Sequence, residues 1–153
     1  MKRVIVAFMV VLGAASILAQ ANSEVGTWKL NPAKSKYDPG PVPRSNVIVI
    51  TMAGQGVTVA AKGTDGEGKP TSADYTVSYD GKDVPVKGQP AYDMTSARRI
   101  DKNTTELARK KGGKVVQTAT RTISADGKTM AVTTTGTDEK GRKIRNVGVF
   151  DKQ

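Results

Sequence analysis

The stretch RTISADGKTMAVTTTGTDEKGRKIRNVGVF, residues 121–150, decides the fold class. It contains two turn signals, ADG at 125–127 and EKG at 139–141, between runs that are rich in Thr and Val. Glycine supplies the positive φ that tight hairpins need, and β-branched residues favour strands. The stretch therefore predicts antiparallel strands that are joined by short turns.

The same pattern continues along the chain from Val25 onward. We expect strands at 25–30, 46–52, 56–62, 71–79, 83–87, 91–101, 104–111, 114–123, 128–136 and 142–151. Short strands separated by turns, with no helical stretch between them, are typical of a meander. Asn103 and Glu106 could instead begin a helix over 104–111, but that helix would lack an apolar stripe, so a strand is favoured.

These strands predict an all-β fold, an antiparallel up-and-down meander barrel of about ten strands, because closing the sheet removes its exposed edges. A two-sheet sandwich is the alternative, and it would need longer crossover connections than most of these turns allow. The loop at 31–45 holds four prolines and cannot form a regular helix. We expect it to bridge the first two strands across one end of the barrel.

The first residues have the three parts of a secretory signal. Lys2 and Arg3 precede an uncharged apolar run at 4–18, and Ala19-Gln20-Ala21 offers small side chains before a cut. We expect residues 1–21 to be a cleaved signal peptide and 22–153 a single domain, exported to the periplasm or the extracellular space. A retained membrane anchor is the alternative, but the run is shorter than the ~20 residues of a span.

Charge and composition limit the classes of function that the protein can have. The net charge is +10, and residues 1–21 carry two of the 24 basic residues and none of the 14 acids, which leaves +8 for residues 22–153. The basic residues are scattered through turns, so we expect a solvated surface and no nucleic-acid partner. We also expect a monomer without a stable membrane anchor. Without His or Cys, we expect no catalytic residues, no metal site, no cofactor and no enzyme activity.

Two terminal motifs resemble those of a known superfamily. VGTWKLN at 25–31 places Gly-x-Trp at the start of the first strand, and the meander closes with GVFDKQ at 148–153. The chain thereby resembles the calycins, which comprise lipocalins and intracellular fatty-acid-binding proteins, and is most similar to small secreted lipocalin-like bacterial proteins. The resemblance implies that Trp28 plugs the base of the barrel. It also implies that an arginine from the last strand crosses Trp28; Arg142 and Arg145 are the candidates, and Arg145 is favoured.

The sequence departs from fatty-acid-binding proteins at two places. The proline-rich loop at 31–45 stands where those proteins carry a helix pair. Their Arg-x-Tyr carboxylate clamp in the last strand is also absent, since Gly148 and Phe150 occupy the matching positions.

Strand alternation predicts which side chains face the lumen. Tyr75 shares a face with Val77. Tyr92, Met94 and Arg98 align with Ile100, Arg109 aligns with Leu107, and Arg121 aligns with Val115 and Ile123. We predict a ligand site formed by Tyr75, Tyr92, Met94, Arg98, Arg109 and Arg121. Alternatively, the arginines lie near strand ends and extend into water.

A lumen that is lined by apolar side chains and a few arginines suits a small amphipathic or anionic molecule, so a binding protein is the leading hypothesis. The alternative is a protein-interaction module, such as an inhibitor, with a filled core and the loop at 31–45 as its presenting segment. An empty lumen would favour the first hypothesis, and a filled lumen the second.

Overall fold

Eleven β-strands and a single 3₁₀ turn form the regular structure of residues 22–153, the part of the chain that this computed structural model describes. The predicted signal peptide lies outside the described residues. The strands are β1 (Gly26–Leu30), β2 (Lys36–Asp38), β3 (Ser45–Ala53), β4 (Gly56–Thr64), β5 (Pro70–Ser78), β6 (Val84–Pro85), β7 (Met94–Asp101), β8 (Thr104–Lys111), β9 (Lys114–Ile123), β10 (Thr129–Thr137) and β11 (Lys143–Lys152), and the 3₁₀ turn η1 spans Pro32–Lys34.

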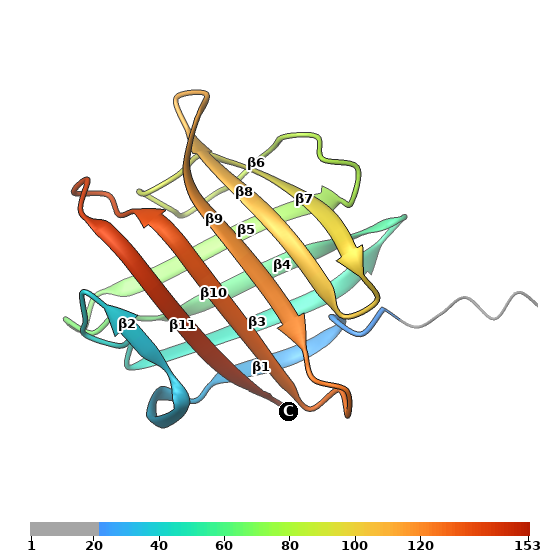
Figure 1. Ribbon diagram of the computed structural model, residues 1–153, viewed down its shortest axis with the longest axis horizontal. Helices are drawn as coiled ribbons and strands as arrows, with labels where there is room; N and C mark the ends of the chain where they lie inside the picture. The colour runs from blue at the N-terminus through green and yellow to red at the C-terminus, as the bar shows by residue number, and fades with distance from the viewer. Residues whose placement is uncertain (1–21) are drawn as a thin grey trace, which may run out of the picture.

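The strands form one antiparallel sheet in the order β5-β4-β3-β1-β11-β10-β9-β8-β7-β6. The sheet curls so that β3–β5 lie behind β8–β11 in the view of Figure 1. Its two edges approach each other, because Asp74 and Lys87 exchange two backbone hydrogen bonds of 3.0 Å each. The predicted all-β meander barrel is confirmed as a nearly closed barrel.

Helices contribute almost nothing to the described residues. The segment 104–111 is strand β8 and not a helix, as the sequence predicts. No helix within residues 22–153 has the length and apolar character needed to cross a membrane.

The core lies at the end of the barrel where β1 begins. Trp28 of β1 is fully buried there, and its Nε1 donates a hydrogen bond of 2.8 Å to the backbone oxygen of Glu24. The buried apolar side chains around it come from most of the strands, and they include Ile50, Val57, Leu107, Met130 and Phe150. Trp28 therefore has the core position that the sequence predicts.

The loop at 31–45 is fastened to the last strand. The 3₁₀ turn begins with Asn31 as its N-cap, and the Asn31 side chain also donates a 2.8 Å hydrogen bond to Asp151. Strand β2 then pairs with β11, with Tyr37 opposite Asn146. The loop thus bridges β1 and β3 as expected, without a helix pair, and brings Tyr37 to the interior.

Two predicted strand faces are wrong, and irregular backbone explains both. Tyr92 precedes β7, so the two-residue period that joins it to Met94 and Arg98 does not hold. Thr95 and Ala97 face the interior, Arg98 is exposed, and the neighbouring Arg99 turns inward instead.

Ile100 shares the face of Arg98 as predicted, but that face is the outer one, and Ile100 is 59% exposed. A bulge accounts for the remaining difference, at the start of β9. The pairing of β8 with β9 skips Val116, which leaves Val115 on the outside and 57% exposed. A bulge inserts one residue, and every side chain beyond it changes face relative to simple alternation.

Candidate ligand cavity

The barrel encloses a cavity of about 220 Å³. Its lining mixes apolar side chains, which include Ile48, Val59 and Leu107, with arginine, glutamine and asparagine side chains. Tyr37, Tyr75 and Tyr92 also line it. A mostly apolar space with a few converging polar groups is the usual form of a small-molecule site.

Two of the tyrosines are held as neutral hydroxyls. Burial raises the pKa of Tyr92 above its ordinary value of 10.0, and the positive charge of Arg109 opposes that shift. Burial likewise raises the pKa of Tyr37, again against Arg109. Neutral phenol groups both donate and accept hydrogen bonds, so they add polar contacts without adding charge.

Gly148 makes room for Tyr37. A Cβ atom at position 148 would lie 3.2 Å from the Tyr37 hydroxyl and 3.0 Å from the ring of Phe150. A side chain at the position that carries arginine in fatty-acid-binding proteins would therefore require small shifts of Tyr37 and Phe150 here.

Arg109 is the half-buried cation of the cavity wall. Its guanidinium lies 4.9 Å from the centre of the Tyr92 ring, and its Nη1 donates a 3.1 Å hydrogen bond to Gln117. Among residues 22–153 no carboxylate lies within 4.0 Å of it, since Arg109 forms none of the ion pairs of the structure. The Arg109 guanidinium is thus available to pair with an anion in the cavity.

Arg121 also lines the cavity, but it already has a partner. Its side chain is 3% exposed, and its Nη2 lies 3.3 Å from Oε2 of Glu24, whose side chain is fully buried. Burial alone would lower the pKa of Arg121, but the nearby oxygens of Tyr75, Glu24 and Tyr79 outweigh it and raise the pKa above its usual value. The guanidinium therefore stays charged inside the barrel.

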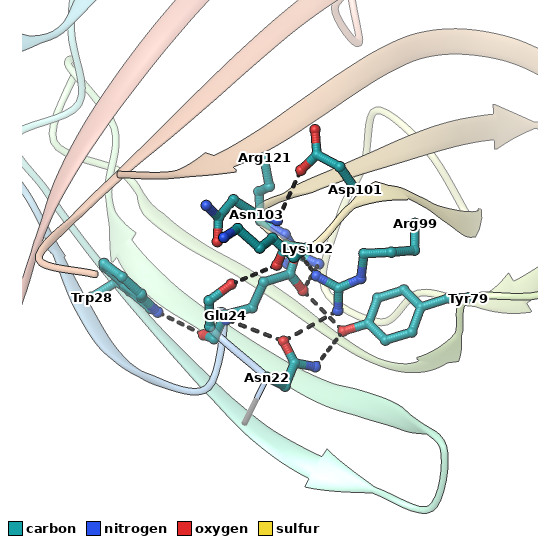
Figure 2. A network of polar contacts seen from close by, with 10 residues as sticks. Asn22, Glu24, Trp28, Tyr79, Arg99, Asp101, Lys102, Asn103 and Arg121 are labelled. Carbon is teal, nitrogen blue, oxygen red and sulfur yellow. Dashed lines mark hydrogen bonds and ion pairs between the residues drawn. The ribbon is translucent and has the colours of Figure 1, made fainter. Parts of the chain in front are cut away.

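Glu24 belongs to a polar network that closes the floor of the barrel (Figure 2). Tyr79 donates a 3.0 Å hydrogen bond to Oε2 of Glu24 and accepts one of 2.7 Å from Asn22. Arg99 stacks 4.0 Å above the Tyr79 ring, and its Nη1 lies 3.8 Å from Oε1 of Glu24. The segment 22–24 is thereby anchored inside the barrel by side chains from β7, β9 and the turn that follows β5.

Sequence reasoning missed Glu24. It precedes the first strand, so alternation assigns it no face, and it lies 97 positions before Arg121 in the chain. One available signal was the requirement that the inward-facing Arg121 find a negative partner, because a buried unpaired charge is costly.

The other predicted site residues lie elsewhere. Tyr75, Tyr92, Arg109 and Arg121 meet at the cavity, whereas half-buried Met94 and exposed Arg98 do not line it. The prediction that Arg145 crosses Trp28 is wrong. Arg145 is exposed opposite Asp38 of β2, and the cation over the Trp28 ring is Lys152, with its Nζ 5.0 Å from the ring centre. Arg142, the other candidate, pairs with Asp138 at 2.7 Å.

A second pocket of about 420 Å³ forms the mouth of the barrel. It lies between Pro39–Pro41 and the turns that join β4 to β5 and β10 to β11. Gln89, Gln117, Ile144 and Asn146 line both this pocket and the inner cavity. The shared lining places the mouth pocket directly next to the inner cavity.

The fold has a solved relative. The crystal structure of zebrafish ileal bile acid-binding protein, complexed with cholic acid, matches with a TM-score of 0.51 and 14% sequence identity, covering 86% of this chain and 99% of that chain. At this identity the similarity shows the fold alone, and it confirms the predicted calycin-like barrel. No protein-family model and no curated protein matches the chain.

Proposed function

We propose that this protein is an exported binding protein that holds a small anionic amphiphile in its barrel. The observation that carries the proposal is Arg109, a cavity cation without a carboxylate partner among residues 22–153, in a lining that also contains apolar side chains such as Ile48 and Leu107. An apolar ligand body would lose its water contacts inside the barrel, and its anionic group would accept charge-assisted hydrogen bonds from the guanidinium. The binding is proposed to be non-catalytic, in keeping with a chain that lacks His and Cys.

The dimensions favour a small ligand. The inner cavity of about 220 Å³ is below the ~300–1,000 Å³ that is common for ligand pockets, and the mouth adds a further 420 Å³. We therefore propose that the ligand body occupies the inner cavity and that any bulkier part extends into the mouth. The cholic acid in the zebrafish relative shows that such a barrel can take an amphipathic molecule, which supports the same class here.

The protein-interaction module has weaker support. Its core was expected to be filled by side chains, and the inner cavity favours ligand binding instead. Its presenting loop at 31–45 is paired with β11 through β2, and its Pro39–Pro41 part borders the mouth. We therefore assign this loop to the entrance of the ligand site.

A titration with matched probes tests the proposal. Decanoate and decanamide share one alkyl chain and differ in charge, so calorimetry on both isolates the contribution of the anion. In Arg109→Met, decanoate should bind about ten- to a hundredfold more weakly, because a hydrogen bond to a charged group is worth about 1.5–3 kcal/mol. Decanamide should bind both forms alike.

Arg98→Met is the matched control, because it removes an exposed arginine from the adjacent strand. It should bind both probes as the unmodified protein does. Equal affinity of the unmodified protein for decanoate and decanamide, or an unchanged decanoate affinity in Arg109→Met, would overturn the proposal.

A further inference from the structure

Glu24 is the one buried acidic side chain among residues 22–153. It lies between two arginines, with Oε2 at 3.3 Å from Arg121 and Oε1 at 3.8 Å from Arg99. The closer arginine is almost completely buried, whereas Arg99 is 25% exposed at the floor of the barrel. Glu24 is therefore chiefly the counter-ion of Arg121.

Arg121 faces two ways at once. Its Nη2 meets Glu24, while the same side chain lines the ligand cavity. Its Nε is buried and has no hydrogen-bond partner, and neither have Oε1 of Glu24 and Nη1 of Arg99. Buried donors and acceptors of this kind ordinarily have a partner, so the floor retains the capacity to bind a further polar group.

The charge of Glu24 decides whether that group can be an anion. An anion that approached Arg121 from the cavity would also approach the Glu24 carboxylate, and the repulsion is strong where little water screens it. Arg109 has no such neighbour among the described residues. The two cavity arginines therefore differ in what they offer to a ligand, although both are cations.

We propose that Glu24 determines the ligand specificity of the barrel: as the built-in counter-ion of Arg121, it limits the interior to one anionic group, bound at Arg109, and excludes a second one from the floor. The inference rests on the proposed function, since it presupposes anion binding in the cavity. It predicts that removal of the Glu24 charge converts Arg121 into a second anion site. Monoanions would then no longer be preferred over dianions.

Glu24→Gln isolates the charge. The amide oxygen can still accept hydrogen bonds from Tyr79 and Arg121. The contacts of the main chain are independent of the substitution, because Trp28 donates to the backbone oxygen of residue 24 and Asn22 accepts from its backbone nitrogen. The segment 22–24 therefore keeps the contacts that place it, and the carboxylate charge is what changes.

The experiment compares decanoate with decanedioate, which has the same chain length and a second carboxylate on a flexible tether. In Glu24→Gln, calorimetric titration should show the affinity for decanedioate rising about tenfold or more relative to decanoate, the scale of one charge-assisted contact. Glu106→Gln is the control, because Glu106 is exposed on the outer face of β8, and it should keep the ratio of the unmodified protein.

The double variant Glu24→Gln/Arg121→Gln covers the case in which the single variant does not fold, since it removes both members of the buried pair. If Arg121 does not bind the ligand anion in the unmodified protein, the decanoate affinity of the double variant should stay within about twofold of the unmodified value. A tenfold loss would show that Arg121 already binds the ligand anion, which overturns the inference.

The outcomes separate this inference from the proposed function. An unchanged dianion-to-monoanion ratio in Glu24→Gln, together with weakened decanoate binding in Arg109→Met, overturns the role of Glu24 and leaves the anion-binding function in place. Failure of the unmodified protein to bind any of the probes overturns both.

Discussion

Nη2 of Arg121 lies 3.3 Å from Oε2 of Glu24, and this contact joins the segment ahead of the first strand to the C-terminal part of β9. The pair is buried, so each charge depends on the other. It lies at the closed end of the barrel and, through Arg121, forms part of the cavity wall. One ion pair thus couples the N-terminal segment to the ligand site.

We first predict that Glu24→Gln destabilises the protein by about 3 kcal/mol, because removal of one partner leaves a buried charge uncompensated. Urea unfolding followed by tryptophan fluorescence would measure the change. The control Glu106→Gln, at an exposed position, should stay within about 0.5 kcal/mol. A loss in Glu24→Gln that is no larger than in this control would show that the pair adds nothing to stability.

The second prediction concerns high pH. Burial raises the pKa of Tyr37, Tyr79 and Tyr92 above their ordinary 10.0, so folding favours the neutral phenol. This contribution to stability is fully present below pH 10.0 and is lost as pH rises through the higher folded-state pKa values. Ultraviolet titration of phenolate absorbance should show these groups ionising above pH 10.0, with unfolding alongside. Ionisation of these three tyrosines at or below pH 10.0 in the folded protein would contradict it.

Tyr92→Phe supplies the internal check on that titration. The variant keeps the buried ring and removes one hydroxyl whose pKa is raised, so the absorbance change above pH 10.0 should shrink by one tyrosine. If the lost signal came from the range below 10.0, the assignment of Tyr92 to the buried set would be wrong.

Much of the fold could be predicted because turns and β-branched runs are local signals. The turns at 125–127 and 139–141 separate strands β9, β10 and β11 as expected. Trp28 could be placed in the core because it is the one large aromatic of the first strand. These features depend on residues near one another in the chain, and sequence patterns report such proximity well.

The site was predictable only in part, because it depends on long-range contacts and irregular backbone. Alternation correctly placed Arg109 and Arg121 inside the barrel, but it was wrong for Arg98. The two-residue period was counted from Tyr92, which precedes β7 and does not belong to the strand. It also says nothing of partners. Glu24 contacts Arg121, and Lys152 contacts Trp28, only because the sheet curls into a barrel. A pattern along one strand does not predict contacts of this kind.

The third prediction concerns the floor of the barrel. Removal of residues 22–24 deletes the backbone oxygen that accepts from Trp28 and the carboxylate that pairs with Arg121. We expect a variant that begins at Val25 to be less stable than the chain that begins at Asn22 and to show red-shifted Trp28 emission as water reaches the indole. Thermal unfolding and fluorescence spectra measure both effects. Equal stability and an unchanged emission maximum would show that the segment is not needed to close the barrel.

The last prediction joins export to this floor. Ala19-Gln20-Ala21 predicts cleavage after Ala21, and Asn22 is then the first residue of the exported protein. Asn22 contacts Tyr79, Arg99 and the backbone nitrogen of Glu24, so a cut at this position would leave the whole floor network in the product. Intact-mass measurement on protein recovered outside the cytoplasm should give the mass of residues 22–153. A mass that includes residues 1–21 would restore the membrane anchor, and a mass that lacks Asn22 to Glu24 would mean that the exported barrel leaves Arg121 without its counter-ion.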